Sequence, residues 1–216
     1  MLRKMRDVLL TLSALTILSV FLMAVSGQGD ISLIHGFNGS KSVPFLADLS
    51  TRAQVTIDYG HHEVHNGELF YITDTASLND GNSRELLFET SDTDEWVHFT
   101  FETTGSYETS VYLYETTTKT TGTAMTELNH NRNSANAATM VVTHTPGGAG
   151  DGTLIFTAYF GADSGPAAMG GIRGNTRPEA EIVLKQNTKY LLRVTSGTNS
   201  NAITTIAAWY EHADKD

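Results

Sequence analysis

The stretch that decides the fold class is EWVHFTFE, residues 95–102. Val97, Phe99 and Phe101 occupy every second position in it. Trp96, His98 and Thr100 occupy the positions between them. Successive side chains of a β-strand point to opposite faces, so this alternation predicts a strand with one face in a core and the other toward solvent. Half-buried strands of this kind are typical of antiparallel sheets.

The same pattern recurs on both sides of this stretch. Segments rich in Val, Ile, Thr, Tyr and Phe, bounded by Gly, Asn, Asp or Ser, are residues 69–73, 84–89, 110–115, 138–144, 153–160, 179–185, 189–195 and 203–211. After the N-terminal segment, no stretch carries the apolar stripe of an amphipathic helix. The spacing of these strands predicts an all-β protein, a two-sheet antiparallel β-sandwich with either a jelly-roll or a Greek-key, immunoglobulin-like topology.

Residues 182–194 predict a more specific feature of such a sandwich. The segment contains a strand, a turn at Gln186 and Asn187, and a second strand that starts near Tyr190. This order is similar to the tyrosine corner of Greek-key sandwiches, in which the phenol bonds a nearby backbone group. We therefore expect a structural role for Tyr190, with ligand contact as the alternative.

Residues 1–30 differ from the rest of the chain. Basic residues precede an apolar run over residues 8–25, and small residues follow at 24–26, which is the pattern of a secretory signal. The run also has nearly the length of a membrane-spanning helix, so an uncleaved anchor is an alternative. A third interpretation is a gene-model extension upstream of a start near Ile31. We expect a hydrophobic helix at 1–30, an extended arm at 31–56 and the sandwich at 57–216.

Composition excludes several classes of function. The chain has 216 residues, a formal net charge of −10 at pH 7 and no cysteine. An acidic chain without a basic stripe lacks the cluster of Lys and Arg that nucleic-acid binding requires. Without cysteine there are no disulfides, thiolate metal sites or cysteine nucleophiles. We predict no nucleic-acid partner and a fold held by packing alone.

The densest cluster of residues that could bind a metal ion is HHEVH, residues 61–65. On an extended strand His61, Glu63 and His65 would share one face and offer a partial Zn²⁺ ligand set. The zincin helix spacing is absent, and one short strand supplies only part of a first shell. We therefore predict no metal and no cofactor, and expect His61, His62 and His65 at a surface or subunit contact.

No enzyme motif stands out elsewhere. The chain has no Gly-x-Ser-x-Gly elbow and no phosphate-binding glycine loop, and its acidic residues are scattered rather than paired. The polar run at 129–134 contains Arg132, a long donor suited to clamping a carboxylate across an interface. A sugar-stacking platform is a further hypothesis, although aromatic residues on strands more often pack in a core; its members would be Trp96, Trp209, Tyr112 and Tyr114. We predict a protein without catalytic activity.

Four stretches together carry a resemblance to a known family: residues 58–65, 129–134, 184–196 and 209–212. Over most of residues 31–216 the chain resembles a family of small virion-associated proteins encoded among the structural genes of tailed bacteriophages. The resemblance implies a capsid decoration or accessory subunit on the virion surface. Its partners would be the major capsid protein or other virion proteins, and further copies of itself in a trimer or array.

The resemblance also bears on the N-terminal segment. A particle assembled in the host cytoplasm needs no signal sequence, so the resemblance favours the gene-model extension, and membrane contact follows only if residues 1–30 are retained. The alternative function is a secreted or membrane-anchored adhesin or carbohydrate-binding β-sandwich. No catalytic residues are implied by the family.

Overall fold

The computed structural model of the chain describes residues 35–38, 41–44, 59–163, 170–174 and 181–213. Contacts divide the chain into two units, Met1–Thr56 and Ile57–Asp216. In the first unit β1 (His35–Asn38) pairs antiparallel with β2 (Lys41–Pro44). The predicted hydrophobic helix at 1–30 and most of the predicted arm lie outside the described residues. In the part of the chain that is described, no helix has the length and apolar character needed to cross a membrane.

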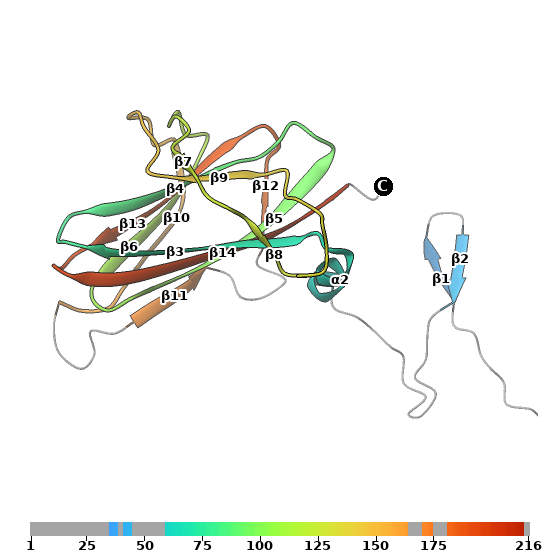
Figure 1. Cartoon of the computed structure of the whole chain (residues 1–216), viewed down its shortest axis with the longest axis horizontal. Helices are drawn as coiled ribbons and strands as arrows, with labels where there is room; N and C mark the ends of the chain where they lie inside the picture. Colours follow the sequence, from blue (N-terminus) through green and yellow to red (C-terminus); the bar gives the residue numbers. More distant parts are fainter. Residues whose placement is uncertain (1–34, 39–40, 45–58, 164–169, 175–180, 214–216) are drawn as a thin grey trace, which may run out of the picture. The chain divides into compact units, whose positions relative to one another are not determined.

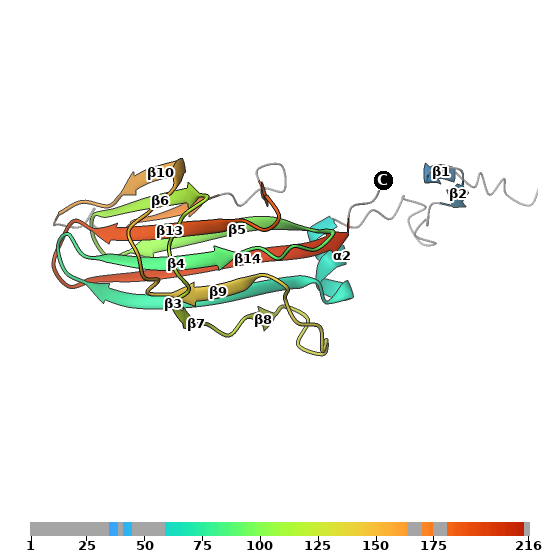
Figure 2. The same ribbon diagram turned by 90° about the horizontal axis from the view of Figure 1, so that it is seen from above.

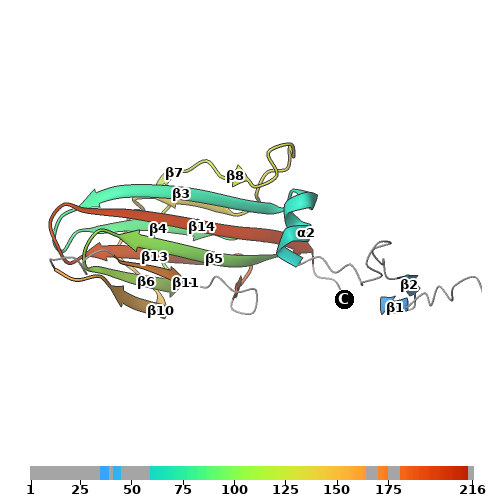
Figure 3. The ribbon, with the colours of Figure 1, turned by 90° about the horizontal axis from the view of Figure 1, so that it is seen from below.

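The second unit is an all-β sandwich of two antiparallel sheets (Figure 1). Sheet I has the order β10 (Thr153–Phe160), β6 (Thr109–Glu115), β13 (Lys189–Ser196), β4 (Ser83–Glu89), β9 (Val141–His144), β7 (Thr123–Ala124). Sheet II has the order β11 (Gly170–Gly174), β5 (Glu95–Gly105), β14 (Asn201–Ala213), β3 (Leu69–Leu78), β8 (Leu128–Asn129), and β12 (Ile182–Leu184) also pairs with β5. Figure 2 shows the strand order of sheet I, and Figure 3 that of sheet II.

The alternation that predicted the fold class decides which residues enter the core. Val97, Phe99 and Phe101 on β5 are at most 3% exposed, whereas Trp96 on the opposite face is 42% exposed. Each of the nine predicted strands corresponds to a strand of the structure, so the all-β class and the two antiparallel sheets are confirmed. The short strands β7, β8 and β11 were not predicted, because two to five residues are too few to show a period.

The core lies between the sheets and is aromatic at its centre. Phe88 of sheet I packs edge to face on Phe99 of sheet II, with ring centroids 4.9 Å apart. Trp209, 1% exposed, lies beside Phe70 within sheet II. Full burial of one such side chain stabilises a fold by about 1.5–3 kcal/mol, so this packing supplies the stability that a chain without disulfides requires.

The segment predicted to hold His61, Glu63 and His65 on a strand is instead a helix, α2 (Tyr59–Asn66), and this prediction was wrong. Gly67, at φ +77°, ends the helix. Its N–H donates to the carbonyl of Val64, and the next N–H, of Glu68, donates to the carbonyl of Glu63. These two bonds form a Schellman motif, which glycine favours because it adopts positive φ without strain.

Candidate functional site

The structure places the residues singled out from the sequence in two separate regions. His61, His62 and His65 lie on α2, and the polar loop that contains Arg132 packs against the end of this helix. Tyr190 lies inside sheet I, on β13. The sequence therefore identified two segments that meet in space, although they are about seventy positions apart in the chain.

Side-chain amides of the loop at 129–136 hold the C-terminal end of α2. Asn131 donates to the carbonyl of His65 at 3.2 Å, and Asn129 donates to the carbonyl of Gly67 at 2.7 Å. Asn136 donates to the carbonyl of Asn66 at 3.4 Å and to the carboxylate of Glu68 at 2.8 Å. Because helix-end carbonyls have no partner within the helix, these amides complete the hydrogen bonding of the terminus. The dense asparagine run is thus a capping loop.

Helical geometry sorts the residues of HHEVH differently from a strand. His61 and His65 are one turn apart, with Nε2 atoms at 3.0 Å, and both are exposed. Glu63 is only 2% exposed, and its carboxylate contacts His62 Nδ1 at 3.1 Å. Glu63 therefore does not share a face with His61 and His65, so the one-face set of two imidazoles and a carboxylate that an extended strand would give is not formed. Among the described residues no three His, Asp or Glu side chains converge as a metal site.

Two ionisable side chains near α2, Glu68 and His130, have pKa values shifted from their usual ones. Burial, followed by the negative charge of Glu95, raises the pKa of Glu68. Burial lowers the pKa of His130, whose ring lies 4.6 Å from that of Tyr71. Within the described part of the chain, Arg132 donates to the carbonyl of Asn129, three residues earlier, at 3.5 Å. Its predicted role as a clamp across an interface stays a prediction.

Tyr190 makes the hydrogen bond that the tyrosine-corner pattern predicted. Its hydroxyl accepts a 2.8 Å bond from the backbone N–H of Lys185 and donates a 3.0 Å bond to Glu115. The turn between the two strands passes through Asn187 at φ 46°. Tyr190 is 1% exposed, so it ties β12 to β13 and has no open ring face for a ligand.

The hypothesis of one sugar-stacking platform was wrong, because the four aromatic residues do not lie together. Trp209 is in the core. Tyr112 and Tyr114 alternate with the core residues Val111 and Leu113 of β6, so they lie on the outer face of sheet I. Trp96 belongs to the outer face of sheet II. Their positions depend on strand pairing that sequence alternation alone does not give.

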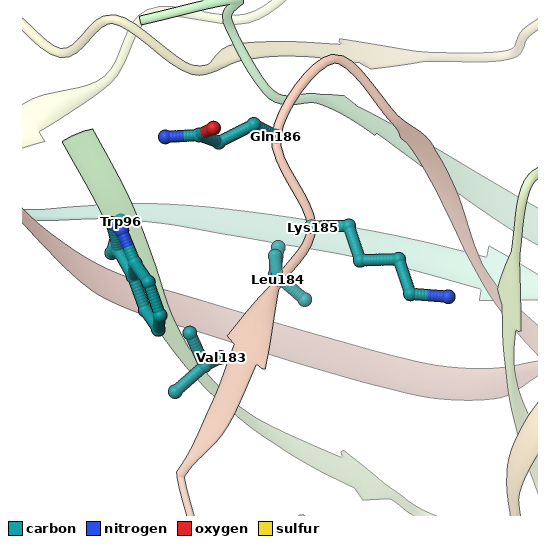
Figure 4. Close-up of a pocket in the computed structure, with 5 residues that line it drawn as sticks. All are labelled: Trp96, Val183, Leu184, Lys185 and Gln186. Carbon is teal, nitrogen blue, oxygen red and sulfur yellow. The ribbon is translucent and has the colours of Figure 1, made fainter. Parts of the chain in front are cut away.

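A pocket of about 390 Å³ lies beside Trp96. The strand β12 and the turn after it form its other wall through Val183, Leu184, Lys185 and Gln186. Figure 4 shows Gln186 above the indole of Trp96 and Val183 below it, while Lys185 points away. Trp96 and Val183 are 42% and 43% exposed. This combination of an open aromatic surface and an amide suits a small ligand with apolar faces and hydroxyl groups.

A polar cluster that the sequence did not indicate adjoins this pocket. His98 and Trp96 alternate with core residues on β5, and His212 on β14 is the direct strand partner of Trp96. Tyr210 is the partner of His98, and their rings stack with centroids 4.4 Å apart. Glu181, which precedes β12, contacts both His98 and Tyr210. Only the pairing of β5 with β14, more than a hundred residues later, brings these side chains together.

The strand β10, which is terminal in sheet I among the described residues, carries exposed apolar side chains. Leu154, Ile155 and Tyr159 on the terminal strand β10 are 48%, 42% and 66% exposed. The pairing of β10 with β6 shifts between Leu154 and Phe156, which marks a β-bulge. Phe156 and Phe160, by contrast, pack against the core. One face of β10 therefore packs against the core, and the other face exposes apolar side chains to solvent.

Ion pairs fix the loop at 146–152 on the outer face of sheet I. Arg193 on β13 donates to Glu85 on the neighbouring β4 at 2.7 Å and to Asp151 in the loop at 2.8 Å. Lys119, 9% exposed, also contacts Glu85 at 3.2 Å. The guanidinium of Arg193 lowers the pKa of Asp151. Arg193 and Lys119 therefore attach this glycine-containing loop to sheet I.

Comparison of the chain with known protein families, curated proteins and solved structures finds no match.

Proposed function

We propose that the protein is a structural subunit of a virus particle, a decoration or accessory protein on the outer surface of the capsid. The resemblance to virion-associated proteins of tailed bacteriophages points to this role. Support from the fold is the apolar character of β10, the terminal strand of sheet I in the described part of the chain. A terminal strand presents backbone groups with which a neighbouring chain can pair, and soluble proteins usually protect such edges with charge, Pro or a β-bulge. Strand β10 has a bulge between Leu154 and Phe156, but it exposes Leu154, Ile155 and Tyr159 and contains no charged residue or Pro.

The partner at this edge is a neighbouring subunit of the particle. A strand or loop of that subunit would add to β10 through backbone hydrogen bonds and cover Leu154 and Tyr159. The net charge of −10 favours a position on the outer surface, because a protein that faces the genome needs basic residues to contact phosphates. Self-association into a trimer or array is the other use of the same edge.

The test is occupancy of purified particles by variants of the full chain. Leu154→Ser/Tyr159→Ser removes the apolar edge, and we expect it to be lost from particles while remaining folded. Ile206→Ser is the matched control, since Ile206 is 40% exposed but lies on β14, a central strand of sheet II. It is expected to be incorporated as the wild type. Absence of the wild type from particles, together with a monomer by light scattering, would refute the proposal.

A carbohydrate-binding role is a second candidate, and the pocket beside Trp96 favours it. Pyranose rings stack on exposed indoles, and Gln186 offers a donor and an acceptor to sugar hydroxyls. Glycan-array binding by the wild type, lost in Trp96→Ala and kept in Tyr159→Ser, is the expected result. Equal glycan binding by wild type and Trp96→Ala would exclude this pocket as the site.

A further inference from the structure

Three tyrosine side chains share the outer face of sheet I where β10 lies beside β6 (Figure 2). Tyr112 and Tyr114 belong to β6, and Tyr159 belongs to β10. In the strand register Tyr112 pairs with Thr157, and Tyr159 pairs with Ser110. Tyr112 and Tyr159 are therefore diagonal neighbours on one face, a distance that aromatic side chains can bridge.

The hydroxyl groups of Tyr112 and Tyr159 are in direct contact. The hydroxyl of Tyr112 donates to that of Tyr159 at 3.3 Å, and the rings are nearly perpendicular, with centroids 6.1 Å apart. The ortho carbons of a phenol are bonded to the carbon that carries the hydroxyl, so this contact also brings ortho carbons of the two rings near each other. Tyr159 is 66% exposed, so its ring has room to turn toward Tyr112 and is accessible to a dissolved oxidant.

The same hydrogen bond favours oxidation of the pair. It lowers the pKa of the acceptor, Tyr159, because a donated hydrogen bond stabilises the phenolate, and it raises the pKa of the donor, Tyr112. A phenolate gives up an electron more readily than a phenol, so Tyr159 is the ring that loses the first electron. The radical that results lies against the hydroxyl of Tyr112, and oxidation of this second ring produces two radicals in contact.

We propose that Tyr112 and Tyr159 are a site of oxidative cross-linking, at which hydrogen peroxide, acting through a haem peroxidase, joins the two rings as dityrosine. Each phenol loses one electron and its hydroxyl proton, and the two phenoxyl radicals form a bond between one ortho carbon of each ring. The hydrogen on each of these carbons then leaves as a proton, and a proton returns to each oxygen, which restores both hydroxyl groups. The pair loses two electrons and two protons in all, and these reduce one peroxide molecule to two molecules of water.

The bond fastens β10 to β6 covalently. It closes a loop between residues 47 positions apart, which stabilises the fold by restricting the unfolded chain. A disulfide has this effect in other proteins, but this chain contains no cysteine. The bond forms in the free subunit and leaves Leu154 and Ile155 unchanged, so it does not depend on the proposed contact of β10 in a particle.

The test is treatment of the dilute full-length protein with hydrogen peroxide and a haem peroxidase, followed by dityrosine fluorescence and mass spectrometry. We expect a monomer that is lighter by two hydrogen atoms, with the link between the peptides that contain residues 112 and 159. Tyr112→Phe and Tyr159→Phe should each abolish the link. Tyr114→Phe is the matched control, since the ring of Tyr114 also lies near that of Tyr112, with centroids 6.3 Å apart, and this variant should keep the link.

Three results would overturn the proposal. The first is a treated monomer without dityrosine, and the second is dityrosine found only between chains. The third is a yield in Tyr112→Phe or Tyr159→Phe equal to that of the wild type. Each of these two variants removes one oxygen atom from the outer face of the sheet and keeps the ring, so the two test the same bond independently in a folded protein.

Discussion

The tyrosine corner can be tested by removing one oxygen atom with Tyr190→Phe. The substitution keeps the buried ring and deletes the hydroxyl that accepts from Lys185 N–H and donates to Glu115. A partly buried N–H without a partner costs about 1–3 kcal/mol. We expect the free energy of unfolding at pH 8 to fall by about 2 kcal/mol.

The same hydroxyl gives the wild type a specific alkaline sensitivity. Burial raises the pKa of Tyr190 from 10 to about 12. As pH rises above 10, the unfolded chain loses this proton first, so the folded state loses stability until its own phenol ionises. At about 1.36 kcal/mol per pKa unit, the loss is about 1.4 kcal/mol at pH 11 and about 2.7 kcal/mol in full. Tyr190→Phe lacks this loss, so its difference from the wild type should shrink by about 1.4 kcal/mol at pH 11.

Urea unfolding at pH 8 and pH 11, followed by tryptophan fluorescence, to which buried Trp209 contributes, measures both effects. Tyr71→Phe is the control, since Tyr71 lies on the outer face of sheet II, and we expect a change below about 0.5 kcal/mol. The reasoning is refuted if Tyr190→Phe is as stable as the wild type at pH 8, or if the difference between them is the same at both pH values.

Two further predictions concern backbone strain and the ion pairs of sheet I. Gly67→Ala should lower stability by more than Gly81→Ala, because both have φ near +75° but a Cβ at Gly67 collides with a neighbouring side chain while Gly81 faces open space; equal melting temperatures would contradict this. Arg193→Met should lower the free energy of unfolding by about 2 kcal/mol and Arg132→Met by less than about 0.5 kcal/mol, as chemical denaturation would show. Since Arg193 lowers the pKa of Asp151, the wild type should lose this stability as pH falls below about 4, and an Asp151→Asn variant that shows the same acid loss would contradict the assignment.

Strand positions could be predicted from the sequence because the alternation of side chains within a strand reflects which of its faces is buried. The alternation in residues 95–102 reflects a local period of two, and it identified the faces of β5 without knowledge of its neighbours. The tyrosine corner was predictable for the same reason, since Tyr190 bonds a group only five residues away.

The helix α2 was missed because its strongest signals lie at its end rather than within it. An eight-residue segment with a single aliphatic residue, Val64, shows no apolar period. Gly67 directly after Asn66 was the available signal, as glycine is the usual residue beyond a helix C-terminus. Read in that way, the sequence would have placed His61 and His65 one turn apart.

The sequence by itself determined the fold class, the strand faces, the acidic charge and the reliance on packing without disulfides, because each follows from local period or composition. Only the tertiary structure decided which strands are neighbours. It separated Trp96 from Trp209 and Tyr112, placed His98 against His212, and exposed Leu154, Ile155 and Tyr159 of β10. Pairing of this kind joins residues more than a hundred positions apart, and it is fixed by how the two sheets bury their common core, which no single segment records.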